Sequence, residues 1–499
     1  MSTTQPQLIV IGAGLGGLAA AIRLLSRGYA VTVLEATDRI GGRASVFERD
    51  GFVFDAGPTV VTAPYLFDEL FAVAGRRFAD HVQMRPVDPF YRVDFDDGSR
   101  FDYVGDEDRI VRQIADFSPR DVAGYHKLVA HSKEIFAIGY EQLAHVPFDR
   151  LTDMLRVVPA MLRLRNHKSV YALVSEYIRD ERLRQVFTFQ PLLVGGNPFR
   201  TSSIYLLIHW LERKWGVHWP LGGTGSIVRA MAQLVADLGG EVVCNANVAE
   251  IEVHHGQVAA VRTADGQRRV CTAVVANADP SRVYRQLVAP QHRHKWTDRK
   301  IGRVVQSMSL FVAYFGTSKR YPAVKHHTIV LGPRYRELLS DIFVRHRLAD
   351  DFSLYLHRPT ASDPSMAPPG CEAFYVLAPI PNDISNVDWQ ARHASFKDAI
   401  YRRLEQTVLP GLRDHIVTDF AFDSRYFAGR LQSEQGAAFG PEPLLRQSAW
   451  FRYHNRSEDV GGLFFVGAGT HPGAGMPGVL TSAKVLDAWL PAVAQVRAP

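Results

Sequence analysis

The stretch "LIVIGAGLGGLAAAIRLL", residues 8–25, constrains the fold more than any other: it is nearly uncharged and holds four glycines within six residues. It could be a membrane segment, or a strand, turn and helix that holds a phosphate. A secretory signal needs a positively charged start, but "MSTTQPQ" before it has no Lys or Arg. The uncharged run also ends at Arg23, and a spanning helix needs about 20 apolar residues. We therefore expect neither export nor anchoring by this segment.

The glycine spacing favours phosphate binding instead. Residues 8–11 are aliphatic and short, as in a buried parallel strand. Gly12, Gly14 and Gly17 then match G-x-G-x-x-G. In this pattern the first glycine allows a tight turn, the second lets backbone approach a pyrophosphate, and the third lets the helix pack on the strand. The helix start also presents free N–H groups and a partial positive charge to the phosphates.

An acidic residue completes this fingerprint. The stretch "GYAVTVLEA" predicts a second strand ending in Glu35, which follows Gly17 by 18 residues (35 − 17). A carboxylate about 20 residues beyond the glycines binds the ribose hydroxyls of a dinucleotide. The order strand, glycine turn, helix, strand and acid therefore predicts dinucleotide binding.

A second glycine-rich turn lies near the other end of the chain. "GLFFVGAGTHPGAGMPGVLTSAKVLDAWL", residues 462–490, reads as strand, turn and amphipathic helix, with the turn glycines Gly467, Gly469, Gly473, Gly475 and Gly478. Two such turns suggest that the ends of the chain meet around one long ligand, which fits FAD better than NAD. A helix N-terminus near Met476 would stabilise negative charge on a reduced flavin. We find no second dinucleotide fingerprint, so NAD is not expected.

Arg43 is a further cofactor candidate. It follows a glycine pair in "RIGGRA", and glycines allow close backbone approach. A guanidinium is the natural bidentate partner of a phosphate or carboxylate. The alternative is a solvated loop arginine.

Composition bounds the remaining possibilities. The 499 residues are 46% hydrophobic and 22% charged, an ordinary globular balance, and the length allows two or three domains. The net charge of +6 is compatible with anionic partners, but we expect no nucleic acid. Three scattered cysteines, Cys244, Cys271 and Cys371, suit neither a disulfide framework nor a zinc site. We expect a reducing compartment and no metal.

These patterns predict an α/β fold. A discontinuous, Rossmann-like FAD-binding domain is expected over residues 1–90, 222–300 and 440–499. Within it, the stretch after "GGTGSIV" reads as a helix followed by a strand whose end holds Val248. An inserted substrate domain with a mixed sheet is expected over 91–106 and 301–439, starting with a hairpin at "DFDDGSRF", where Asp97-Gly98 marks the turn. Residues 107–221 have helical periodicity and form the third region.

Two stretches of this helical region mix apolar, aromatic and basic residues. Residues 154–173 hold four basic side chains among aliphatics, and residues 203–223 group three tryptophans with Arg213 and Lys214. Such a pattern describes a segment that lies at a membrane interface without crossing it. The alternative for each is an ordinary core helix with a solvated basic face.

Several motifs together resemble the bacterial-type phytoene desaturases, FAD-dependent carotenoid desaturases of the amine-oxidase-like flavoprotein superfamily. They are "VIGAGLGGLAAAIRL", "LEATDRIGGRA", "FDAGPTVV", "LLVGGNPFRTSSIYLLIHWLE", "GGTGSIV", "ANADP" and "VGAGTHPGAGMPGV". The nucleotide motifs are shared by many flavoenzymes, whereas "GGNPF…SSIY" and "GAGTHPGAG" are much narrower. The resemblance implies FAD contacts from Gly12, Gly14, Leu15, Gly16, Gly17, Glu35, Arg43 and Val248, and from the turn between Gly467 and Val479, which includes Gly469 and Gly478.

The activity implied by the resemblance is stepwise dehydrogenation of 15-cis-phytoene toward all-trans-lycopene. A flavin would accept hydride, since no side chain does, and a base would take the proton. His471, in the second glycine turn, is the candidate base; alternatively it only packs against or orients the ring. Asp149 in "VPFDRL" is a weaker candidate, since it could be a helix N-cap.

The expected partners follow from the same chemistry. They are a carotenoid hydrocarbon taken from lipid, the lipid of a membrane to which the protein is peripheral, on its cytoplasmic face, and oxygen or a quinone as electron acceptor. Two other functions stay open: a different flavin oxidoreductase of the superfamily, such as an amine oxidase or a desaturase of another carotenoid intermediate, and a non-catalytic flavin or carotenoid carrier.

Overall fold

A parallel five-stranded sheet organises one half of the molecule. The computed structural model describes residues 6–493, and the strand order in this sheet is β19-β13-β1-β2-β9. Every neighbouring pair is parallel, as expected for short aliphatic strands buried on both faces. The strands are β1 (Gln7–Ile11), β2 (Ala30–Leu34), β9 (Glu241–Val243), β13 (Ala273–Ala276) and β19 (Leu463–Phe465).

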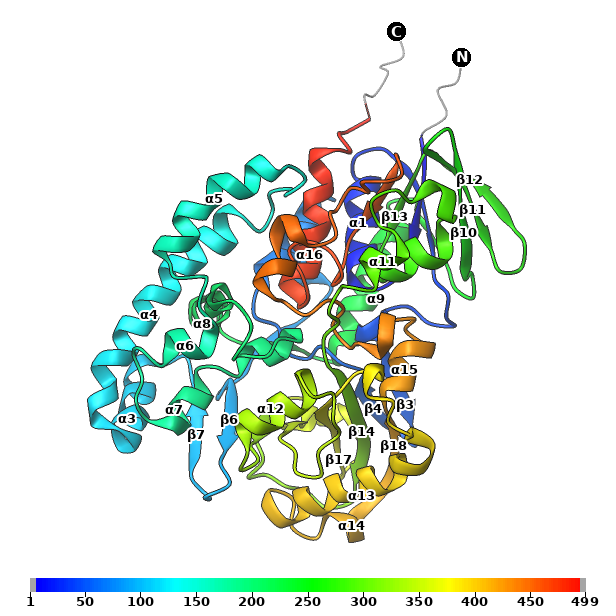
Figure 1. Ribbon diagram of the computed structural model, residues 1–499. Helices are drawn as coiled ribbons and strands as arrows, with labels where there is room; N and C mark the ends of the chain where they lie inside the picture. Colours follow the sequence, from blue (N-terminus) through cyan, green and yellow to red (C-terminus); the bar gives the residue numbers. More distant parts are fainter. Residues whose placement is uncertain (1–5, 494–499) are drawn as a thin grey trace.

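Three helices pack together beside this sheet: α1 (Leu15–Leu25), α9 (Thr224–Asp237) and α16 (Met476–Val485). Figure 1 shows α1 and α16, from opposite ends of the chain, lying together. Apart from Arg23, helix α1 is built of aliphatic residues and glycine, and it is buried along almost its whole length. Arg23 of α1 forms an ion pair with Asp487, at 2.6 Å between Nη2 and Oδ2. The two ends of the chain therefore complete one layer.

A separate three-stranded antiparallel sheet corrects the predicted position of Val248. The strand after α9 already ends at Val243, and the chain then turns through Asn245, whose φ is 56°. Val248 begins β10 (Val248–His254), which pairs with β11 (Gln257–Thr263), and β11 pairs with β12 (Arg268–Val270). The left-handed backbone at Asn245, a residue type that tolerates it, is what separates the two strands.

A mixed seven-stranded sheet forms the lower part of the molecule in Figure 1, with the order β18-β14-β17-β16-β15-β6-β7. The hairpin expected at Asp97-Gly98 is confirmed, because β6 and β7 pair antiparallel. Strand β6 pairs with β15 in parallel and so joins strands more than two hundred residues later in the chain. The strands are β6 (Tyr91–Asp94), β7 (Arg100–Tyr103), β14 (Ser309–Thr317), β15 (His327–Val330), β16 (Leu354–His357), β17 (Glu372–Ile380) and β18 (Ile416–Phe422).

Two small two-stranded sheets and several helices complete the fold. Strands β3 (Val46–Arg49) and β4 (Phe52–Asp55) pair antiparallel, as do β5 (Met84–Pro86) and β8 (His218–Pro220). The core on one side of the large sheet includes α13 and the core on its other side includes α12. The remaining helices of the molecule are α2 (Tyr65–Ala72), α10 (Pro280–Arg282), α11 (Asp298–Ile301), α12 (Tyr335–Phe343), α13 (Trp389–Thr407), α14 (Leu412–His415) and α15 (Ser424–Gly429).

A group of helices stands to the left in Figure 1. Its members are α3 (Glu107–Phe117), α4 (Val122–Phe136), α5 (Leu151–Arg163), α6 (Val170–Val174), α7 (Glu181–Val186) and α8 (Leu207–Trp215). Helix α5 is unlike the rest, because none of its residues is buried. Within residues 6–493, no helix has both the length and the apolar character needed to cross a bilayer.

Candidate functional site

One continuous cavity of about 590 Å³ connects the parallel sheet to the mixed sheet. At one end it is lined by the two glycine turns, and at the other by α5, α12 and the strands of the mixed sheet. Binding cavities in two-domain α/β proteins commonly lie at such a junction. The two ends differ in chemistry and are described in turn.

The first glycine turn leaves no space for side chains. A Cβ added at Gly14 would lie 2.9 Å from Nδ2 of Asn277, and one at Gly16 would lie 2.5 Å from Oδ1 of the same residue. Gly12, Gly14, Leu15 and Gly16 line the cavity. Gly17 lies behind them, where a Cβ would come within 2.0 Å of the Gly12 carbonyl oxygen. Backbone is thus exposed to the cavity at the N-terminus of α1, as an anionic ligand requires.

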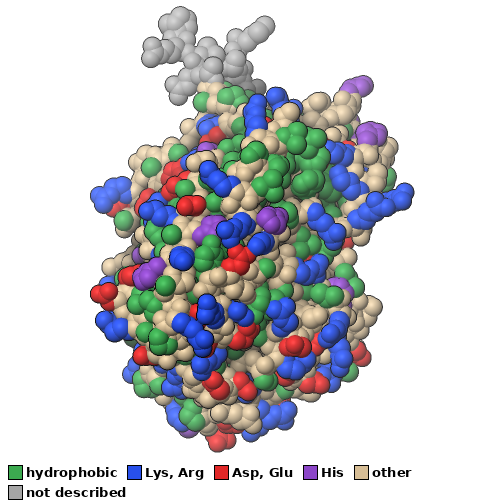
Figure 2. All heavy atoms as spheres, turned by 60° about the vertical axis from the view of Figure 1, so that its left-hand side comes forward, with side chains coloured by type: hydrophobic (Ala, Val, Ile, Leu, Met, Phe, Trp, Pro, Cys, Tyr) green, Lys and Arg blue, Asp and Glu red, His purple; other side chains and the backbone are tan. Residues whose placement is uncertain are grey.

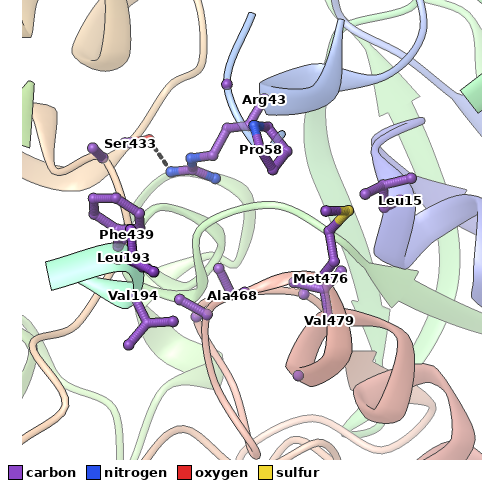
Figure 3. Close-up of a pocket in the computed structure, with 18 of the residues that line it drawn as sticks. Leu15, Arg43, Pro58, Leu193, Val194, Ser433, Phe439, Ala468, Met476 and Val479 are labelled. Carbon is purple, nitrogen blue, oxygen red and sulfur yellow. Dashed lines mark hydrogen bonds between the residues drawn. The ribbon is translucent and has the colours of Figure 1, made fainter. Parts of the chain in front are cut away.

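The second glycine turn meets the first across Asn277. A Cβ at Gly467 would lie 2.5 Å from Asn277 Oδ1, and the Asn277 amide donates to the Gly12 carbonyl at 3.4 Å. Gly467, Gly469, Gly478 and Val479 all line the cavity. Figure 3 shows Leu15 of α1 opposite Met476 and Val479 of α16. Asn277 belongs to the motif "ANADP", but the sequence analysis did not single it out as a residue of the site. Its position directly after a buried strand is the signal that could have identified it.

Glu35 lies at the end of β2 and ties the turn to the second strand. Its Oε2 accepts from the Ala13 N–H at 2.8 Å, and its Oε1 accepts from the N–H and the hydroxyl of Thr37. The carboxylate is buried yet lines the cavity. The backbone N–H groups of Ala13 and Thr37 therefore fix the position of the carboxylate, which faces the cavity. Val248, despite its different strand, lines the cavity nearby.

Arg43 faces the same cavity. Its guanidinium donates to the Ser433 hydroxyl at 2.7 Å, as Figure 3 shows, and its buried Nε has no hydrogen-bond acceptor within the described residues. Burial lowers the pKa of this guanidinium. A buried cation with a free N–H is well suited to a negatively charged or carbonyl-bearing ligand. Together with the glycine turns and Glu35, it gives a site that fits FAD.

The other end of the cavity is aliphatic. Its walls come from strands β14, β15, β16 and β17 and helices α5, α8 and α12, with side chains that include Met154, Val157, Met161, Leu207, Met308, Leu310, Val312, Ile329, Leu331, Leu338, Leu339, Ile342, Leu354 and Leu377. Surfaces of this kind favour a hydrocarbon and exclude water. This end offers few polar groups to a ligand.

Glu212 of α8 is the acidic residue on this wall. Burial raises its pKa to about 8, although the Tyr91 hydroxyl donates to its Oε1 at 2.7 Å. Its Oε2 is buried without a partner among the described residues. The side chain is therefore mostly protonated at neutral pH, which keeps the aliphatic end of the cavity uncharged.

His471 lines the cavity within the second glycine turn. Burial lowers the pKa of its imidazole to about 4, and neither ring nitrogen has a partner in the part of the chain described. The ring also packs edge-on against Phe148, at 5.0 Å between centroids. A neutral, unpartnered imidazole is able to accept a proton, and its packing agrees equally with an orienting role.

Asp149 has neither of the roles considered for it. The N-cap of α5 is Arg150, and no side chain caps the helix. Asp149 itself is half-buried and is not among the residues that line the cavity. The helix begins one residue later than a capping Asp149 would require.

The structure separates the two candidate interfacial stretches. Residues 203–223 are largely interior: Trp219 is fully buried and its indole N–H donates to Asp55 at 3.3 Å, so an interfacial position for this stretch is wrong. Helix α5, which spans much of the first stretch, is exposed, with Leu155 at 61% and Leu162 at 58%. The two stretches differ because α8 packs against α4, whereas α5 lies over the cavity.

The comparisons with known proteins agree with this site. The family of flavin containing amine oxidoreductases matches residues 15–485. A lycopene-forming phytoene desaturase of Pseudescherichia vulneris is 50% identical over 95% of this chain and 97% of the relative. One of Pantoea ananas is 49% identical over the same shares. A neurosporene-forming phytoene desaturase of Rhodobacter capsulatus is 43% identical over 98% and 95%.

Solved structures agree on the fold. An oxidoreductase of Methanosarcina mazei has a TM-score of 0.65 at 16% identity, covering 96% of this chain and 98% of its own. Putrescine oxidase bound to putrescine has a TM-score of 0.63 at 16% identity, covering 97% and 98%. At such identities the likeness concerns the arrangement of the chain alone.

Proposed function

This chain belongs to the flavin containing amine oxidoreductases and, among them, to the bacterial-type phytoene desaturases, and from this premise we propose that the continuous cavity described above holds FAD and phytoene end to end. The enzyme desaturates phytoene stepwise toward lycopene and uses FAD. The observation that carries the proposal is the continuity of a glycine-turn end with an aliphatic end in the same cavity.

The cofactor contacts follow from the geometry of the first end. We propose that the backbone of Gly12, Gly14 and Gly16 holds the pyrophosphate, that Glu35 binds the ribose hydroxyls, and that Arg43 binds an oxygen of the cofactor. Leu15, Val248, Gly467, Gly469, Gly478 and Val479 complete the contact set, with Gly17 packing the helix against the strand. When bound, FAD supplies the acceptor for the hydride that leaves the hydrocarbon.

The protein's own contribution to the reaction is positioning and proton removal. The aliphatic walls exclude water and align the polyene so that one C–C unit at a time lies at the glycine-turn end. His471 would accept the proton from the neighbouring carbon at a ring nitrogen, since burial keeps the imidazole neutral. A His471→Gln variant that retains FAD should lose roughly 10²-fold or more in turnover. Unchanged turnover would leave His471 a packing role only.

The substrate supports a peripheral position on a membrane. Phytoene is a hydrocarbon and must come from lipid. Met154 and Val157 of α5 line the cavity, while Leu151, Leu155 and Leu162 of the same helix are exposed. We propose that this outer face of α5, with the exposed arginines Arg156 and Arg163, docks on the cytoplasmic face of an anionic membrane.

The exposed apolar surface near α5 is not confined to that helix. Phe451 and Leu445, 46% and 38% exposed, belong to 3₁₀ turns of which one contacts α5. In Figure 2, where this side comes forward, hydrophobic side chains gather on the upper part of the face among Lys and Arg. A quinone dissolved in the same membrane, or oxygen, would reoxidise the flavin.

The decisive experiment incubates purified protein with FAD and phytoene in liposomes and follows coloured polyenes. Lycopene is the expected product, and neurosporene would mean one desaturation fewer. Amine oxidation with inert phytoene would favour an amine oxidase, for which the aliphatic wall is a poor match. Bound pigment without conversion would favour a carrier.

Membrane docking is tested separately by sedimentation with anionic liposomes. Burial of one leucine contributes roughly 1.5–3 kcal/mol, so Leu155→Asp should weaken binding by about tenfold or more. Val270→Asp is the matched control, because Val270 is 65% exposed on β12, on the other side of the molecule in Figure 1. Equal effects of the two variants would refute docking through α5.

A further inference from the structure

Three buried histidines meet at the inner end of strands β15 and β16. His326 immediately precedes β15, and His327 pairs with His357 across the two strands. All three side chains are buried, at 5%, 0% and 0% exposure. Each histidine offers one ring nitrogen, and these three nitrogens lie within 4.8 Å of one another. Nothing in the desaturation chemistry uses this cluster.

The hydrogen bonds of the cluster leave one side of it unsatisfied. Nδ1 of His327 hydrogen-bonds the Tyr355 hydroxyl, and Nδ1 of His326 hydrogen-bonds the Ser362 hydroxyl, each at 2.7 Å. Nε2 of both residues, and both ring nitrogens of His357, are buried without a partner within residues 6–493. Buried polar atoms almost always have a partner, so four free nitrogens together point to a bound ion or water.

We propose that His326, His327 and His357 form a binding site for one divalent transition-metal ion of the Zn²⁺ type. Three imidazoles with an open fourth position are a well-known ligand set for zinc, whereas Mg²⁺ and Ca²⁺ prefer oxygen. In two of the three rings Nδ1 is already held by a hydroxyl and Nε2 is free, which is the arrangement that orients a metal-binding histidine. Metal binding by these histidines goes beyond the proposed function and does not depend on it.

The surroundings keep the ligands in the form that binds metal. Burial lowers the pKa of all three imidazoles, that of His327 to about 3, so the rings are neutral at physiological pH. The indole of Trp219 packs against His326 and His357, at 5.2 and 6.2 Å between centroids. Zn–N bonds of about 2.0–2.1 Å place two ligand nitrogens about 3.3 Å apart, so the nitrogens, now within 4.8 Å of one another, would have to move closer together when the ion binds.

The site reaches the cavity through hydroxyl groups. Tyr355, bonded to His327, is also hydrogen-bonded to Thr59 at 3.0 Å, and Thr59 is bonded to Tyr375 at 2.6 Å. Both tyrosines and Thr59 line the cavity. The ion would therefore cross-link β15 and β16 behind the wall and fix the orientation of these groups, a positioning role without redox chemistry.

The test uses the untagged, FAD-loaded enzyme. After dialysis against a chelator, Co²⁺ is titrated and its d–d absorption is read beyond the flavin bands, and Zn²⁺ is then added in competition. We expect about one Co²⁺ per chain, displacement by Zn²⁺, and a thermal midpoint raised by several degrees with either ion. His327→Gln and His357→Gln should lose the signal. The matched control His294→Gln, at an exposed loop position, should keep it.

Two outcomes would overturn the proposal. One is a wild-type enzyme that binds well under one equivalent of Co²⁺ with an unchanged thermal midpoint; the cluster then holds only water. The other is a Co²⁺ spectrum that persists in FAD-retaining His357→Gln. If the histidine variants fail to fold, the stoichiometry and the thermal shift of the wild-type enzyme still decide, because both are measured without any substitution.

Discussion

The two ends of the cavity recognise their ligands by different means. At the glycine-turn end the walls are largely backbone, supplied by two short stretches and tied by Asn277, Glu35 and Arg43. At the other end they are single aliphatic side chains drawn from seven strands and helices. A charged ligand needs directed N–H groups, which only a defined local conformation provides. A hydrocarbon needs only volume and apolar surface, so many residues serve equally.

The strongest test of this contrast is a side chain added to the backbone end. Gly14→Val should abolish FAD binding and all activity, because its side chain would occupy the approach to the pyrophosphate beside Asn277. The flavin absorbance of the purified protein measures this. Gly429→Ala, at a position with nothing within 4 Å, should remain yellow. A yellow Gly14→Val protein would contradict the whole fingerprint.

Filling the aliphatic end should separate cofactor binding from turnover. Ile329→Phe adds volume to the wall formed by β15, so phytoene conversion should fall at least tenfold while FAD content stays constant. Overpacking itself costs about 1–3 kcal/mol of stability, which thermal melting will show. Val417→Phe, on an exposed strand position, is the control. Loss of FAD from Ile329→Phe would mean that the two ends are not independent.

A smaller loss is expected from the acidic residue of the backbone end. Glu35→Ala removes the acceptor of the Ala13 and Thr37 N–H groups as well as the proposed ribose contact. Hydrogen bonds to a charged group contribute about 1.5–3 kcal/mol, so FAD should bind roughly tenfold or more weakly. Titration of apoprotein with FAD gives the value. Unchanged affinity would show that Glu35 serves only the turn.

The smallest effect on activity at neutral pH should come from Glu212→Gln. Burial raises the pKa of Glu212 from 4.5 to about 8, so between these values the folded protein keeps a proton that the unfolded chain has released. The contribution of Glu212 to the free energy of unfolding is therefore complete below pH 4.5. It is lost as the pH rises toward 8, and the loss is on the order of 4 kcal/mol. Glutamine removes this component.

Thermal or urea unfolding of the FAD-loaded enzyme at several pH values tests this prediction. The stability of Glu212→Gln should decline less than that of wild type between pH 5 and 8. Glu250→Gln, a half-exposed position on β10, should follow the wild type. Parallel curves for Glu212→Gln and wild type would mean that Glu212 is ionised within the cavity.

The contrast between the two ends of the cavity also explains which parts of the site could be predicted from the sequence. The glycine turns, Glu35 and the hairpin at Asp97-Gly98 were all visible, because each structure is encoded by neighbouring residues. The aliphatic wall was not, because Leu310 or Leu339 has no local pattern that differs from core. Both residues reach the cavity only through the pairing of strands far apart in sequence.

Other differences have the same origin. Residues 154–173 and 203–223 share a composition, and only packing decided that α5 is exposed while Trp219 is interior. Val248 was assigned to the wrong strand because one turn at Asn245 divides a continuous β-like run. The histidines at 326 and 327 are 30 residues or more from His357 (357 − 327), a spacing that matches no metal motif, so strand pairing alone brings them together.

The ion pair between Arg23 and Asp487 joins segments that are 464 residues apart in sequence (487 − 23). One of the two glycine turns of the proposed flavin cradle lies directly before α16, so a chain cut short ahead of residue 467 lacks it. Contacts of such long sequence separation also form slowly. A version of the protein truncated ahead of this turn should therefore purify without the yellow colour of bound flavin.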